Sequence, residues 1–192
     1  MKFKIPKIDK KLLLEIVFIS FGVFLGLLLN QWKENISNEE LVEKTLKNIR
    51  VEVTDNKEKV QAMLNSHNEV MKNIDELISV IDNPEKQSDF KMDLSFRQVS
   101  SSAWETAKLT KAIAQMDINT LMEIGGIYEF QEYYQSIIKS YALNNIYIRH
   151  KEIDKEFVIN MKNLITALIP MENDLLGYYN NLLEKTLNNY QN

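Results

Sequence analysis

The sequence has no cysteine, only five glycines and only two histidines. Without cysteine the chain forms no disulfide, carries no lipoprotein-type acylated cysteine, and offers no thiolate zinc site or thiol nucleophile. None of the glycines belongs to a phosphate-binding loop, and neither His67 nor His150 belongs to a zinc motif such as H-E-x-x-H. His150 with Asp154 would supply only two metal ligands. We therefore expect no catalytic, cofactor or metal site, and a protein that is not an enzyme.

Clusters of basic residues are also missing from most of the chain. The net charge is −4, and five of the lysines lie before residue 12, so the remaining sequence is more acidic than this total suggests. An acidic surface repels a phosphate backbone. Nucleic acid is therefore not an expected partner.

What the sequence does contain is a long apolar run near its beginning. Between Leu12 and Leu29, Glu15 is the only charged residue and Ser20 the only other polar side chain. A helix of this length rises roughly 27 Å, close to the thickness of the bilayer's hydrocarbon core. No small-residue cleavage site follows it, and a soluble core helix is rarely apolar around its whole circumference. The sequence therefore predicts a retained transmembrane anchor over residues 12–30.

The residues that flank the anchor predict its orientation and its contacts with lipid. Residues 1–11 form a basic tail, which the positive-inside rule places in the cytoplasm, with residues 31–192 on the other side of the membrane. Asn30 and Trp32 then lie at the membrane interface, where aromatic residues are enriched. Eleven residues are too few for a cytoplasmic signalling domain.

Glu15, Gly22 and Gly26 are the candidate helix contacts within the anchor. Gly22 and Gly26 form a G-x-x-x-G pattern on one helix face, which allows a second helix to approach closely. Glu15 lies near the cytoplasmic end, where its carboxylate would reach water or pair with Lys11. Alternatively, Glu15 is an intramembrane acid that contacts a partner or carries protons, as in a channel or motor subunit.

The segment from about residue 37 to residue 82 contains neither glycine nor proline. Its seam positions follow a 4-3 spacing, which predicts one long helix of coiled-coil type. Beyond Val60 a third apolar row widens the seam, so we expect a stalk near the membrane and a bundle helix farther away. The seam consists of Val42, Leu46, Ile49, Val53, Asn56, Val60, Met63, His67, Val70, Ile74, Leu77 and Ile81.

Asn56 and His67 are the two polar residues of this seam. A buried asparagine at such a position fixes the register and number of helices in a coiled coil. The simpler alternative is that both side chains face solvent or have a satisfied hydrogen bond. A lone histidine also senses pH in some proteins, but no neighbouring residue in the sequence supports that role here.

The remaining sequence predicts shorter helices and no strands, so the fold class is all-α. Pro84 lies in a turn over residues 82–89, Ser100–Ser102 cap a helix through residues 103–116, and Asp117 caps the next one. Pro170 is expected to end a fourth helix and begin a fifth. The predicted order is a transmembrane helix, a stalk and first bundle helix over 31–82, and further bundle helices over 83–192.

Two blocks of the sequence support a resemblance. The pattern E-(x)6-G-(x)7-N-x-W in residues 15–34, "EIVFISFGVFLGLLLNQWKE", resembles the anchor of a bacterial family of single-span envelope proteins with a domain of unknown function. Residues 101–117, "SSAWETAKLTKAIAQMD", and 127–134, "IYEFQEYY", resemble its second block. The resemblance implies a bacterial, membrane-anchored helical domain and no particular activity. Together with the orientation expected from the basic tail, it predicts an inner-membrane protein with a periplasmic domain. It also singles out Trp104, Thr106, Ala107, Tyr128 and Gln131 as a partner surface or core motif.

We therefore expect a non-enzymatic scaffold or accessory subunit of a membrane or envelope complex. The span and the stalk would contact the bilayer and either a protein partner or a second copy of the chain. The alternative is a periplasmic ligand-sensing module that signals through its span to a partner membrane protein. That alternative requires a pocket within the bundle.

Overall fold

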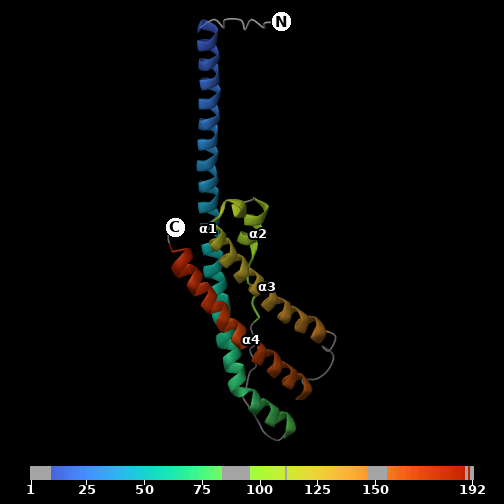
Figure 1. The fold of residues 1–192 in the computed structure, drawn as a ribbon. Coiled ribbons are helices and arrows are strands. Elements are labelled where there is room, and N and C mark those ends of the chain that lie inside the picture. The colour runs from blue at the N-terminus through green and yellow to red at the C-terminus, as the bar shows by residue number, and fades with distance from the viewer. Residues whose placement is uncertain (1–9, 84–95, 111, 147–154, 189, 191–192) are drawn as a thin grey trace, which may run out of the picture.

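The computed structural model describes residues 10–83, 96–110, 112–146, 155–188 and 190, and these contain helices and no strand (Figure 1). The predicted all-α class is confirmed. The basic tail up to residue 9, most of the turn around Pro84, and the pair His150 and Asp154 lie outside the described residues.

Helix α1 (Lys10–Asp82) joins the apolar run and the heptad segment without a break. It has 73 residues, so it is about 110 Å long. Figure 1 shows its N-terminal half projecting alone, away from all other elements. The apolar window in this half has a mean hydropathy of 2.2 and is not buried at all by the rest of the protein. The window is therefore not part of this chain's own core, and it is long and apolar enough to cross a membrane.

The second half of α1 forms a bundle with the rest of the chain. The other elements are α2 (Ser102–Leu109), the 3-10 turn η1 (Ala112–Gln115), α3 (Ile118–Ile146), α4 (Lys155–Asn181) and the π-helical turn η2 (Leu182–Thr186). Helix α4 packs along α1, and α3 packs on α4. The predicted seam is the buried face of α1, because its positions from Leu46 to Ile74 are all buried.

The bundle begins closer to the anchor than the narrow seam suggested. Ile49 and Val53 are fully buried, in the same core as Ala112 and Leu187. The C-terminal turns pack here, and the Arg50 guanidinium donates hydrogen bonds to the carbonyl oxygens of Leu183 and Leu187, at 3.1 and 2.7 Å. The largely exposed part of α1 between the anchor and the bundle is therefore limited to residues 31–44.

Two expected helix boundaries are wrong. Pro170 lies inside α4 rather than at its end. Proline removes one backbone hydrogen bond from a helix, but buried residues on both sides of it, such as Leu168 and Leu175, hold the helix on α1. The helix expected over 103–116 instead stops at Leu109, and η1 turns Ala112 into the core.

The predicted cap of α3 is confirmed. The Asp117 carboxylate accepts a hydrogen bond of 2.8 Å from the backbone N–H of Thr120. This bond, which stabilises the charged form, holds the pKa of Asp117 below its ordinary value.

Candidate functional site

The candidate contact residues of the anchor all lie on the free half of α1. Glu15, Gly22, Gly26 and Asn30 are exposed, and Trp32 has 65% of its surface exposed. No described atom of the chain comes within 4 Å of a Cβ built on either glycine. The protein's own fold therefore leaves the G-x-x-x-G face open, and its pairing with another helix stays a prediction.

The second block of the resemblance forms a compact aromatic site at the side of the bundle. The rings of Trp104 on α2 and Tyr128 on α3 stack with their centroids 5.6 Å apart and their planes 4° from parallel. A Cβ at Gly125 would touch the Trp104 ring at 3.5 Å, an ordinary van der Waals contact, so the stack leaves little room for a side chain larger than alanine there. Thr106 is exposed, and its hydroxyl donates only to the Ser102 carbonyl oxygen in its own helix. It does not join the site.

Glu52 of α1 holds the aromatic site against the bundle. Its Oε1 accepts a 2.7 Å hydrogen bond from the Tyr128 hydroxyl. Its Oε2 accepts hydrogen bonds from the Ser100 hydroxyl at 2.6 Å and from the Ala103 backbone N–H at 3.0 Å. Burial, and secondly the bond to Glu52, raise the pKa of Tyr128. The start of α2 is thus capped by Glu52 from another helix and by the Ser100 hydroxyl, which accepts a 3.2 Å hydrogen bond from the Ser102 backbone N–H. Of the expected cap residues Ser100–Ser102, Ser101 makes no capping bond with its side chain.

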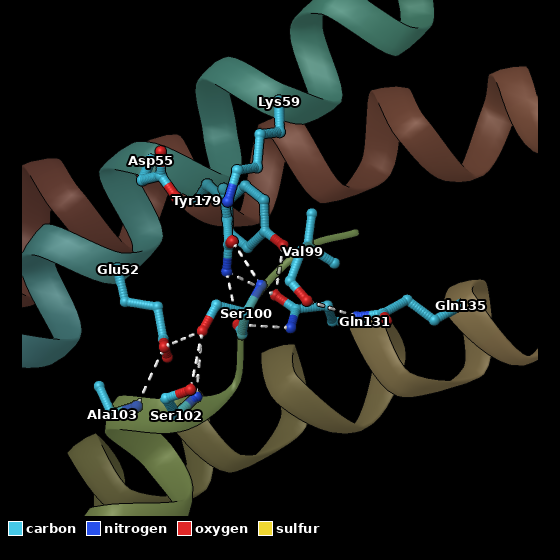
Figure 2. A network of polar contacts seen from close by, with 11 residues as sticks. Glu52, Asp55, Lys59, Val99, Ser100, Ser102, Ala103, Gln131, Gln135 and Tyr179 are labelled. Carbon is cyan, nitrogen blue, oxygen red and sulfur yellow. Dashed lines mark hydrogen bonds and ion pairs between the residues drawn. The ribbon is translucent and has the colours of Figure 1, made fainter. Parts of the chain in front are cut away.

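Asn56 and Gln131, both fully buried, bind the extended segment 96–101 from two sides. The Asn56 side chain pairs with the backbone of Ser100: its Oδ1 accepts the N–H and its Nδ2 donates to the C=O, both at 2.8 Å. Gln131 Nε2 donates to the same C=O at 2.9 Å and to the Ser101 hydroxyl at 3.2 Å. Figure 2 shows Ser100 at the centre of this network, between Glu52 and Gln131.

The acceptor atom of Gln131 is also fully used. Its Oε1 receives hydrogen bonds from Tyr179 Oη at 2.6 Å and from Asn56 Nδ2 at 3.1 Å. The network therefore joins α1, α3, α4 and the extended segment. The expectation of a satisfied hydrogen bond for Asn56 is confirmed, and these bonds lie within its own chain. Such a network fixes how the helices pack, and it uses all four N–H donors of the two amide groups within the chain.

A second polar cluster lies deeper in the bundle, around the other polar seam residue. His67 and Glu172 are both fully buried, with His67 Nδ1 2.8 Å from Glu172 Oε1. The Tyr134 hydroxyl donates a 2.7 Å hydrogen bond to the same oxygen. The His67 contact is short but poorly aligned, and His67 Nε2 and Glu172 Oε2 have no hydrogen-bond partner among the described residues.

This second cluster was not predicted from the sequence. The expectation that no neighbouring residue supports a role for His67 is wrong, because the fold brings Glu172 next to it. The sequence does contain a feature that could have predicted this cluster. Glu172 lies four residues after Leu168 and three before Leu175, so it occupies a position on the apolar face of α4. A carboxylate at such a position requires a polar partner from another helix.

Among the described residues, no group of three or more histidine, aspartate and glutamate side chains is placed to hold a metal ion. The groove beside the aromatic site is open to solvent and is lined by Ser101, Trp104, Glu105, Lys108, Gly125, Tyr128, Glu129, Glu132 and Gln135. Its lining offers surface contacts rather than an enclosed reaction site.

Comparison with protein-family models, curated proteins and solved structures finds no significant match to this chain.

Proposed function

We propose that the protein is a single-pass, non-enzymatic scaffold or accessory subunit of a bacterial inner-membrane or envelope complex. The resemblance in the anchor and in the second block suggests the bacterial envelope. The basic tail favours a cytoplasmic N-terminus and a periplasmic bundle. The observation that carries the proposal is the continuity of α1, whose one helix contains both the exposed apolar window and the core face of the bundle.

Because α1 is one continuous helix, it fixes the rotation of the bundle about the helix axis relative to the anchor. Each added helical residue turns the following segment by about 100° and moves it by about 1.5 Å. A partner that contacts both the open glycine face of the span and the bundle would therefore depend on the number of residues between them. Residues can be added without disturbing the core in the largely exposed region 31–40, because Leu41 and Val42 already pack against the core.

Insertions between Glu39 and Glu40, both exposed, test this dependence. Two alanines rotate the bundle by about 200°, whereas seven rotate it by about 700°, which is within about 20° of the original face. After gentle detergent extraction, we expect proteins that co-purify with the wild type to be lost with two alanines and retained with seven. Equal recovery with both insertions would overturn the rigid coupling, and recovery of the wild type as a bare monomer would overturn the accessory role.

The absence of cysteine makes the topology directly testable. Asn68→Cys places one thiol on an exposed position of the bundle. In intact cells of a bacterial host whose outer membrane has been permeabilised, a membrane-impermeant maleimide should label this thiol. Labelling only after the inner membrane is disrupted would refute the periplasmic placement.

A further inference from the structure

The most exposed large apolar side chains of the bundle lie around the turn between α2 and α3. Beyond residue 36, the three most exposed large apolar residues in the described part of the chain are Leu109, Met122 and Ile118, at 83%, 69% and 60%. Leu109 ends α2, and the other two lie in the first turns of α3, on either side of η1. We call these three residues the apolar corner. Side chains of this kind are ordinarily buried, so this concentration suggests a contact surface.

The apolar corner lies at the end of the bundle nearest the anchor. Element η1 packs on α1, and its last residue, Gln115, lines a groove with α1 residues between Asn35 and Glu43. In Figure 1, the turn between α2 and α3 is level with the point where α1 leaves the bundle. Position 38 is only eight residues past the expected end of the span, a rise of roughly 12 Å.

With the helix upright, this distance leaves the corner a few ångströms beyond the headgroup region, and a tilt of the helix closes that gap. The polar interface adds several ångströms to each side of the hydrocarbon core. A spanning helix is ordinarily tilted by about 20°, which lowers one side of a bundle toward the bilayer by several ångströms more. Two described charges beside the corner are engaged within the chain: Lys108 pairs with Glu105 at 2.6 Å, and Asp117 caps α3. Apolar side chains flanked by charges that are already paired can insert into the membrane interface without leaving an unpaired charge there.

We infer that Leu109, Ile118 and Met122 dock on the lipid surface of the leaflet into which α1 is anchored. The bundle then has two attachments to the membrane, the span and the corner, which together fix its tilt and the direction that its opposite side faces. This inference rests on the proposed membrane anchoring.

The test uses the full chain with single cysteines, reconstituted in vesicles of phosphatidylcholine and phosphatidylglycerol. A fluorescent nitrobenzoxadiazole probe is attached at Leu109→Cys or Met122→Cys. Asn68→Cys, thirty residues farther along α1 than Asn38, is the matched exposed control, and Leu25→Cys reports the span. Spin-labelled lipids, in the headgroup for the corner and in the acyl chain for the span, quench probes that contact the membrane.

We expect the probes at 109 and 122 to lose more emission to the headgroup spin label than the probe at 68. If the probe at 25 is quenched while those at 109 and 122 behave like that at 68, the docking inference fails and the anchor stands. If the probe at 25 is not quenched either, the proposed membrane anchoring fails. Emission shifted to the blue without lipid quenching would identify a protein contact at the corner and would also overturn the inference.

The probes at positions 109 and 122 replace two of the apolar residues under test, so a second experiment places the probe at a neighbouring position instead. Ala114 of η1 is exposed, so Ala114→Cys reports the same corner without altering it. Combining it with Leu109→Gln, Ile118→Gln and Met122→Gln should remove most of the quenching at position 114. Unchanged quenching would show that the apolar side chains do not cause docking.

Discussion

The buried amide of Gln131 should be one of the most costly polar side chains of the bundle to remove. In Gln131→Ala, the buried Tyr179 hydroxyl loses its hydrogen-bond acceptor, and Asn56 Nδ2 loses one of its two acceptors. Ser100 keeps its bonds to Asn56. One buried hydroxyl left unpaired costs about 1–3 kcal/mol, and the lost side chain also leaves a void. We expect the free energy of unfolding to fall by about 3 kcal/mol.

Gln135 is the matched control, one turn later on the same helix. It is only half-buried, and its side chain makes a single hydrogen bond, to the Val99 carbonyl oxygen at 3.0 Å. Water replaces that bond more easily, so Gln135→Ala should cost about 1 kcal/mol.

Urea unfolding of the full chain in mild detergent measures both losses. Trp32→Phe makes Trp104, which stacks on Tyr128, the only tryptophan. Gln131→Ala and Asn56→Ala should also be non-additive, because their side chains are bonded directly and share the Ser100 carbonyl. If Gln131→Ala costs no more than Gln135→Ala, the network does not hold the bundle together as argued.

Three further predictions use the same assay. Gly125→Ala should raise the free energy of unfolding by up to about 1 kcal/mol, because the added Cβ only touches the Trp104 ring. Gly125→Leu should displace that ring and lower the free energy of unfolding, and equal effects of the two substitutions would refute the close approach of Trp104 to Gly125. Glu172→Ala should cost about 3–5 kcal/mol, while His67→Leu with Glu172→Met should restore most of it, and additive losses would contradict a coupled buried pair. Stability should fall above pH 10.0, by up to about 4 kcal/mol per pH unit from the three fully or almost fully buried tyrosines alone, because burial strongly raises their pKa and the unfolded chain therefore loses their protons first. Phenolate absorbance should then rise together with unfolding, and early titration of all tyrosines would refute this; the three are Tyr128, Tyr134 and Tyr179.

Local periodicity predicted the parts of the structure that depend on one helix. The 4-3 spacing identified the buried face of α1 residue by residue, including Leu46 and Ile74, because a helix repeats every 3.6 residues whatever packs against it. The cap at Asp117 was predicted for the same reason, since its hydrogen bond reaches only three residues along the chain.

The predictions that failed are those in which distant residues override a local rule. Pro170 is a local stop signal, but burial of its neighbours on α1 keeps α4 continuous. His67 seemed isolated because Glu172 and Tyr134 are far away in the sequence. The resemblance singled out Trp104, Tyr128 and Gln131, but it did not reveal that Glu52 and Asn56 of α1 bind them or their neighbours.

The sequence by itself determined the helices, the seam and the apolar segment, because hydrophobic burial and helix geometry act between near neighbours in the chain. Only the tertiary structure decided where the bundle begins, how the segment 96–101 is held, and which buried polar groups pair. Those pairings join residues dozens of positions apart, and a buried polar group is stabilised only by the partner that the fold brings to it.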